Sequence, residues 1–162
     1  MTARYPLVLN STTIQEIQSG DSYNLYANTT VNGFNEGTTV SASSPSSTTN
    51  FDVATQSVQY YTSNTANNWT LNIRGNASTS LTSLLATNQS ISVVLLVTNG
   101  STAYYNSVVQ VDGTTTGVTT KWQTGTSPTS GNTNSVDVYN YVITRTSATP
   151  TYTVLASQTK FA

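Results

Sequence analysis

Six carboxylates are the residues of this chain that could carry out acid–base or metal chemistry: Glu16, Asp21, Glu36, Asp52, Asp112 and Asp137. The chain has no histidine and no cysteine, which excludes imidazole catalysis, thiol nucleophiles, disulfides and the common zinc sites. A glycoside hydrolase needs two carboxylates at a set separation. No two of these acids are neighbours in sequence, so only strand pairing could bring two of them together.

A structural role is the simpler interpretation of these acids. Asp112 precedes Gly113 and is typical of a turn, while Asp52 and Asp137 are expected as charges at strand edges. The sequence contains neither a Gly-rich phosphate loop nor a nucleophile elbow. We therefore expect no catalytic residue, no cofactor and no metal, in a protein that is not an enzyme.

Aromatic side chains are the second group that could form a site. In Tyr60-Tyr61 and Tyr104-Tyr105 successive side chains would point to opposite faces of a strand, so that one ring of each pair is exposed. We take Trp122, Tyr60 and Tyr104 as a candidate exposed aromatic surface for stacking on a sugar or anchoring a protein interface. The alternative is that tyrosine is simply favoured in strands.

The charge content excludes several classes of partner. Charged residues make up 7% of the chain and its net charge is −1, whereas a nucleic-acid-binding protein needs clustered lysine and arginine. About half of the residues are Ser, Thr, Asn or Gln. The most apolar stretch, Val93–Val97, is too short to span a bilayer. We expect no nucleic-acid binding and no membrane insertion.

Strand patterns predict the fold. Trp69–Arg74 alternates apolar and polar residues, with Trp69 on the core side, and Ser90–Thr98 is apolar on both faces, as in a central strand. Asn99-Gly100 predicts a tight turn that joins this strand to Thr102–Val111 in an antiparallel hairpin. A second hairpin is expected from Val136–Thr146 and Thr151–Phe161. Further strands are expected at Tyr5–Leu9, Thr12–Ile17, Tyr23–Val31 and Phe51–Tyr61.

Helical signal is confined to Ser78–Leu85, where Leu81, Leu84 and Leu85 share one face behind a capping hydroxyl. About eight strands and one short helix predict an all-β protein, an antiparallel β-sandwich of jelly-roll type with an extended N-terminal arm.

Residues 38–50 are rich in Ser and Thr and lack apolar periodicity, so they are expected to be a linker. They would separate an N-terminal attachment arm, residues 1–37, from a β-sandwich domain, residues 51–162. The arm is too short to fold alone easily and needs a surface to lie on. Its candidate interface residues are Arg4, Tyr5, Leu7, Leu9, Ile14 and Ile17.

The opening MTARYPLVLNSTTIQEIQSGD resembles the start shared by many structural proteins of marine tailed phages, the cyanophages and pelagiphages. The strings FDVATQSVQYYTSN, WTLNIRGNASTSLTSLLAT, LLVTNGSTAYYNS and TVLASQTKFA resemble the rest of the same family, so the resemblance covers almost the whole chain. It implies a virion structural protein and carries over no catalytic motif. It does not choose between head and tail.

We expect a small head-decoration or knob protein on the outside of the virion, bound to the major capsid protein or another virion protein and to itself, for example as a trimer. The first residues lack a secretory signal, which agrees with synthesis in the host cytoplasm. The alternative is a tail-fibre or appendage module that binds a host surface glycan or receptor. A polysaccharide-degrading enzyme is the least supported interpretation.

Overall fold

The computed structural model describes residues 35–162 and, before them, the strands β1 (Leu7–Asn10) and β2 (Thr13–Glu16). The chain divides into two units, residues 1–34 and 35–162. β1 and β2 pair antiparallel, with Leu7 opposite Glu16 and Asn10 opposite Thr13. The strands expected at Tyr5–Leu9 and Thr12–Ile17 are thus confirmed with shifted bounds, whereas the one expected at Tyr23–Val31 lies outside the described residues.

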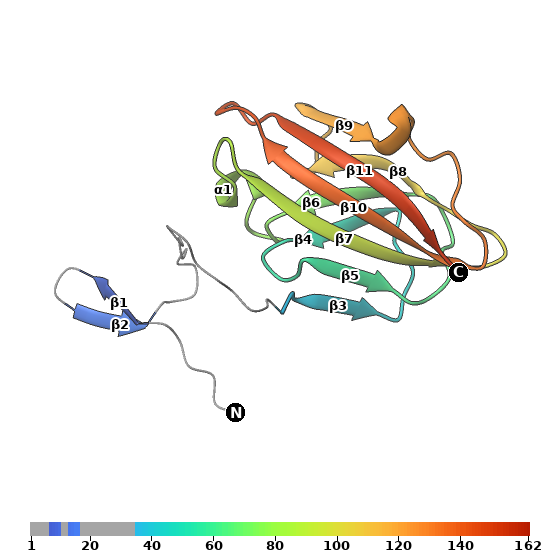
Figure 1. Ribbon diagram of the computed structural model, residues 1–162, viewed down its shortest axis with the longest axis horizontal. Coiled ribbons are helices and arrows are strands. Elements are labelled where there is room, and N and C mark those ends of the chain that lie inside the picture. Colours follow the sequence, from blue (N-terminus) through green and yellow to red (C-terminus); the bar gives the residue numbers. More distant parts are fainter. Residues whose placement is uncertain (1–6, 11–12, 17–34) are drawn as a thin grey trace. The chain divides into compact units, whose positions relative to one another are not determined.

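Residues 35–162 are mostly β-structure and form two sheets (Figure 1). The six-stranded sheet has the order β3-β5-β7-β10-β11-β9, and the three-stranded sheet has the order β4-β6-β8. The six strands of the larger sheet are β3 (Thr38–Ser41), β5 (Val58–Tyr61), β7 (Ser90–Asn99), β10 (Ser135–Arg145), β11 (Tyr152–Phe161) and β9 (Val118–Trp122). The smaller sheet contains β4 (Thr48–Asp52), β6 (Trp69–Arg74) and β8 (Asn106–Val111).

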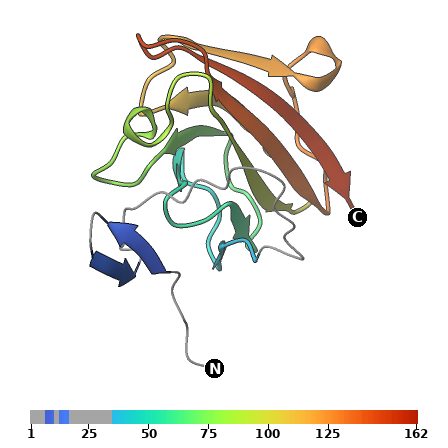
Figure 2. The same cartoon turned by 60° about the vertical axis from the view of Figure 1, so that its left-hand side comes forward.

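From β3 to β8 the chain crosses from one sheet to the other after every strand, as the turned view in Figure 2 helps to follow. Strands that return to the same sheet therefore run in the same direction. β3-β5, β5-β7, β4-β6, β6-β8 and β11-β9 are parallel pairs. The antiparallel order expected from the sequence holds in this unit for β7-β10 and β10-β11.

The hairpin expected at Asn99-Gly100 is wrong. β7 ends at Asn99, but the following residues lead to β8 in the other sheet, where β8 pairs with β6. Asn99 is 2% exposed, and its side chain bonds Asp137 instead of closing a two-residue turn. The hairpin between β10 and β11 is confirmed, with Val136 opposite Phe161 and Arg145 opposite Tyr152.

The linker expected at residues 38–50 is not what the structure shows, because this segment contributes β3 to one sheet and the start of β4 to the other. Likewise, Phe51–Tyr61 is not one strand: it contains the end of β4, a turn and all of β5. β3 and β4 are edge strands with few apolar residues, so they show no periodicity. The main unit accordingly begins at residue 35 rather than 51.

The helix signal is confirmed in shortened form. α1 (Leu81–Leu84) forms one turn, and the Ser80 hydroxyl accepts a hydrogen bond from the Ser83 backbone N at 3.1 Å. A 3-10 turn, η1 (Gln123–Gly125), follows β9. In the described part of the chain, no helix has the length and apolar character needed to cross a bilayer.

One hydrophobic core fills the space between the two sheets. Alternate residues of β7, β10 and β11 turn inward, where they meet Trp69, Leu71 and Ile73 of β6. Trp69 is fully buried and its ring meets that of Tyr139 edge-on, with centroids 5.7 Å apart. The strand expected at Trp69–Arg74 and its inward-facing Trp69 are both confirmed.

Two leucine-to-alanine substitutions test this core. Leu95 in β7 is fully buried, so Leu95→Ala is expected to lower the free energy of unfolding by about 2–5 kcal/mol through lost apolar contact and a cavity. Leu84 in α1 is 49% exposed, so Leu84→Ala is the control and should cost less than about 1 kcal/mol. Urea denaturation followed by circular dichroism measures both. Equal losses would contradict this assignment of the core.

Candidate functional site

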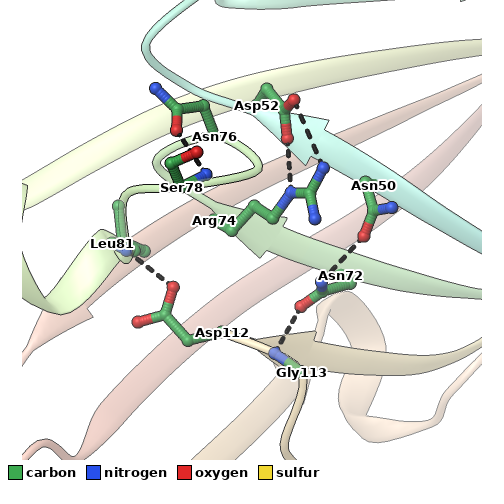
Figure 3. A network of polar contacts seen from close by, with 9 residues as sticks. All are labelled: Asn50, Asp52, Asn72, Arg74, Asn76, Ser78, Leu81, Asp112 and Gly113. Atoms are coloured by element: carbon green, nitrogen blue, oxygen red, sulfur yellow. Dashed lines mark hydrogen bonds and ion pairs between the residues drawn. The ribbon is translucent and has the colours of Figure 1, made fainter.

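The acids of the three-stranded sheet are engaged in internal contacts (Figure 3). Asp52 and Arg74 end the neighbouring strands β4 and β6, and the Arg74 Nε lies 2.7 Å from the Asp52 Oδ1. Beside this ion pair, Asn72 Nδ2 donates to Asn50 Oδ1 at 2.8 Å, and the Gly113 backbone N donates to Asn72 Oδ1 at 2.7 Å. These contacts hold the ends of β4, β6 and β8 together.

Asp112 lies in the turn after β8, as expected, and has a further role that the sequence does not reveal. It adopts a φ of 50° and Gly113 one of 81°, the left-handed geometry of a tight turn. Its carboxylate accepts hydrogen bonds from the backbone N of Leu81 at 2.6 Å and of Thr82 at 3.0 Å, and from the Thr82 hydroxyl at 2.9 Å. Asp112 therefore fastens the start of α1 to the end of β8 (Figure 3).

Asp137 was expected at a strand edge, and this expectation is wrong. The residue faces inward from β10 and is fully buried. Its carboxylate accepts hydrogen bonds from the side chains of Asn99 at 3.0 Å, Asn132 at 2.7 Å and Gln158 at 2.8 Å, and from the backbone N of Asn132 at 3.0 Å. Four N–H donors compensate the buried charge without a cation, which fixes the loop before β10 against the sheet.

A carboxylate pair is not formed by these contacts. Asp52, Asp112 and Asp137 each have donors of their own, and Glu36 accepts a hydrogen bond from the Ser57 hydroxyl at 3.2 Å. The side chains of Glu16 and Asp21 lie outside the described residues. Among the residues whose side chains the structure describes, no three acids gather where they could hold a metal ion.

Trp122 contributes to a groove at one margin of the six-stranded sheet. The groove has a volume of about 440 Å³ and is lined by Lys121, Trp122, Gln123, Asn140, Val142, Leu155, Ala156 and Ser157. The Trp122 ring meets Tyr141 and Tyr139 edge-on, with centroids 6.1 Å and 6.5 Å apart, so it is half-buried against the core. An apolar floor with two amide side chains could take a sugar ring or an apolar side chain of another protein.

The structure does not bring the three candidate aromatic residues together. Tyr60 lies on β5 and Trp122 on β9, and three strands separate these two in the sheet. Tyr60 is half-buried on the outer side of the sheet while Tyr61 is buried, which is the alternation expected from the sequence. Tyr104, by contrast, lies in no strand but in the segment before β8, half-buried against the core.

The candidate interface residues of the N-terminal unit are placed only in part. Leu7 and Leu9 lie in β1, and Ile14 lies in β2, where it is the backbone partner of Leu9. Their side chains, together with Arg4, Tyr5 and Ile17, lie outside what the structure describes. The role of these residues stays a prediction.

Asn106 is a buried polar residue that sequence reasoning missed. Its side chain donates to the backbone carbonyls of Trp69 at 3.1 Å and Val108 at 2.8 Å, and it accepts from the Tyr141 hydroxyl at 3.1 Å. Its backbone N also lies 3.4 Å from the Tyr139 hydroxyl. The sequence did carry one signal for such a residue. Tyr139 and Tyr141 lie two apart on one strand and so share a face, and two inward tyrosines need buried partners for their hydroxyls.

Burial raises the pKa of three tyrosines. The pKa of Tyr139 is raised by burial and then by the negative charge of Asp137, and that of Tyr141 by burial and then by Tyr139. Burial also raises the pKa of Tyr61, against the opposing effect of a hydrogen bond with Thr49. All three are therefore uncharged at neutral pH.

Two substitutions test the role of Asp112. Asp112→Gly keeps the left-handed turn but removes the acceptors at α1, so it should lower the free energy of unfolding by about 1–3 kcal/mol. Asp112→Asn also tolerates this backbone geometry and keeps one acceptor oxygen, so its loss should be smaller. Urea denaturation at pH 7 measures both. A glycine variant as stable as the parent protein would rule out this role.

The raised pKa values of these tyrosines predict that the free energy of unfolding falls at alkaline pH. An unfolded tyrosine loses its proton near pH 10, whereas Tyr61, Tyr139 and Tyr141 keep theirs in the folded protein. The folded state therefore binds more protons above about pH 10, and the free energy of unfolding falls as the pH rises from there. Denaturant midpoints at pH 8 to 11 measure the fall, and Tyr139→Phe should make it shallower. A midpoint that is constant over this range would contradict the prediction.

Comparison with known proteins gives no further constraint on this site. No protein-family model, no curated protein and no solved structure matches the chain.

Proposed function

We propose that this protein is a phage virion structural protein that binds the outside of the capsid as a head decoration or knob protein. The observation that carries the proposal is the division of the chain into a β-rich unit, residues 35–162, and a separate N-terminal unit, residues 1–34. The resemblance of the sequence to marine tailed-phage structural proteins supports it. In this arrangement the first unit attaches to the shell and the second projects from it.

The use of charge in the main unit supports a binding role over a catalytic one. Asp112 and Asp137 accept internal hydrogen bonds, and Asp52 forms an ion pair with Arg74. The surface is accordingly made largely of hydroxyl and amide groups. Copies with such a surface can stand close together on a particle without strong mutual repulsion. We infer that the protein is not an enzyme.

We further infer that the two sheets form a β-sandwich. Inward side chains of both sheets share one buried core, as sandwich layers do. A jelly roll is built from antiparallel neighbours, and the parallel pairs from β3 to β8 depart from that pattern. Within this proposal the jelly-roll likeness is limited to β7, β10 and β11.

The partner that fits this role is the major capsid protein or another virion protein, together with further copies of the chain. The low charge of the sequence speaks against nucleic acid. Nor does the sequence hold an apolar stretch long enough for membrane insertion. The location in this proposal is the exterior of the virion, after synthesis in the host cytoplasm.

A second candidate function is glycan or receptor binding by a tail-fibre or appendage module. The groove beside Trp122 favours it, because Val142 and Leu155 offer an apolar surface and Gln123 and Asn140 offer amide partners for sugar hydroxyls. The Trp122 ring supports this groove from the core side, where it packs against Tyr139 and Tyr141. A polysaccharide-degrading enzyme has weaker support, since each described carboxylate already has internal donors.

Particles that lack the protein provide the test of capsid binding. The full chain is expected to cosediment with them, and the chain starting at Asn35 is expected to bind at least tenfold more weakly. The cut at residue 34 keeps the Gly37 carbonyl, which accepts hydrogen bonds from the backbone N of Ser57 at 2.9 Å and of Val58 at 3.1 Å. Circular dichroism and cooperative unfolding check that the shortened chain is folded. Equal binding of the two chains would overturn the attachment role of residues 1–34.

Variants of Trp122 distinguish glycan binding from capsid binding. In the alternative function, Trp122→Ala removes the ring that supports the groove and weakens binding to host surface glycans at least tenfold, while Trp122→Phe, which keeps an aromatic ring, retains most of it. Because this ring packs against Tyr139 and Tyr141, circular dichroism and cooperative unfolding check that both variants are folded. Capsid cosedimentation should be unchanged in both variants. A full chain that binds host glycans but fails to bind particles would favour the second function over the first.

A further inference from the structure

The outer face of the six-stranded sheet, opposite the core, carries many apolar side chains, about half of its strand residues. Alternation along each strand and the backbone register place its apolar residues on the same side, half-buried or exposed. Val40 is 64%, Leu155 54% and Phe161 58% exposed. We call this surface the outer face; its apolar members are Val40, Val58, Tyr60, Val94, Leu96, Val136, Val138, Val142, Leu155 and Phe161.

Many of these side chains are neighbours across the sheet. Val40, Tyr60, Leu96 and Val138 are successive backbone partners across β3, β5, β7 and β10 and so form a row across four strands. A second row joins Val58 to Val94, and Val142 pairs with Leu155 across β10 and β11. Monomeric proteins rarely leave a continuous apolar area of this kind in water.

The sequence of β7 indicates that another protein surface covers the outer face when the protein is assembled. A strand that is apolar on both sides is typical of a sheet with both faces packed. Val93, Leu95 and Val97 face the core, whereas Val94 and Leu96 face outward. In the main unit the three-stranded sheet packs on the inner side, so the second apolar side has no counterpart among residues 35–162.

The charge of the outer face suits a second copy of the same face. Among the strand residues on this side of the sheet, Lys121 of β9 is the one charged side chain, and the others are apolar residues, Ser, Thr and Asn. β9 lies at the margin of the sheet. Two copies related by a two-fold axis between the central strands β7 and β10 would therefore keep their lysines at opposite margins.

The outer face is also large enough for a stable dimer. At about 4.8 Å between strands and about 3.3 Å per residue, the six strands cover about 700 Å². A stable protein pair buries about 800 Å² on each partner. Because side chains protrude from the sheet, its solvent-accessible area is larger than the area of the flat sheet. Contact over the whole face is thus of the size that a lasting dimer needs.

From these observations we propose that the protein forms a two-fold dimer in which the outer faces of the six-stranded sheets pack against each other. The contact is isologous, with the strands of the two sheets crossing at a small angle and with apolar rows interleaving across the interface. This inference concerns the main unit and does not depend on capsid binding.

Analytical ultracentrifugation of the full chain tests the dimer, with two matched valine variants. Val142 on the outer face is 37% exposed, and Val108 on the three-stranded sheet is 39% exposed. Val142→Lys puts a charge into each side of the interface and is expected to raise the dissociation constant at least tenfold. Val108→Lys adds the same charge at the same exposure elsewhere and should leave the constant unchanged.

Chemical cross-linking locates the contact, because the natural chain has no cysteine. Asn140 is an exposed residue of the outer face on the central strand β10, close to the expected two-fold axis. Asn140→Cys with a short bis-maleimide should give a covalent dimer at low micromolar protein. Val108→Cys is the control and should stay monomeric under the same conditions.

Several results would overturn the proposal. These are a monomer at 100 µM concentration, a trimer, or a dimer that both lysine variants weaken equally. A monomeric protein whose Val142→Lys variant no longer binds particles would assign the outer face to a shell protein instead. Because capsid binding is measured separately, its failure leaves the dimer test unaffected.

Discussion

Trp69, Tyr139 and Tyr141 meet in the core, and their contact joins two sheets that share no backbone ladder. The Trp69 ring lies edge-on against Tyr139, and the Tyr139 and Tyr141 rings are stacked with centroids 6.3 Å apart. Asn106 of β8 donates to the Trp69 backbone carbonyl, accepts from the Tyr141 hydroxyl and donates its backbone N–H to the Tyr139 hydroxyl. Both tyrosine hydroxyls therefore have partners inside the core, whereas the buried Trp69 Nε1 has none. These bonds make the burial of the two tyrosines possible, because an unpaired hydroxyl in the core costs about 1–3 kcal/mol. The positions of β6, β8 and β10 relative to one another follow from these contacts.

The route of the chain is a consequence of the same core. Successive strands from β4 to β8 alternate between the two sheets, so that both sides of the core receive inward residues from this part of the chain. Polar side chains hold the loops and strand ends at these crossings in place. Asp112 fastens α1 to the end of β8, the Asp52–Arg74 pair joins β4 to β6, and Asp137 fixes the loop before β10. Four of the eight charged side chains of residues 35–162 are used in this way.

This use of charge shapes the surface on which function depends. With Asp112 and Asp137 committed to internal donors, the outside is left with hydroxyls, amides and the apolar outer face. Association with proteins is the activity that such a surface favours, because apolar area gives affinity and the scarcity of charge permits close packing of copies. In the functions proposed above, the N-terminal unit contacts the particle and the outer face contacts a second copy.

Local pattern was enough to predict strands where burial alternates cleanly, as in Trp69–Arg74, β7 and the β10–β11 hairpin, and to predict the turn at Asp112 and the short helix behind Ser80. It failed for β3 and β4, whose edge positions leave them almost without apolar residues, and for Asn99, whose side chain is held by Asp137 rather than by a turn. It also failed for the candidate site, since residues far apart in the chain decide that Asp137 is buried and that three strands separate Tyr60 from Trp122. The reason is physical: alternation along a strand determines which side chains share a face, but the neighbour of that strand is chosen by long-range packing, which spacing along the chain does not encode.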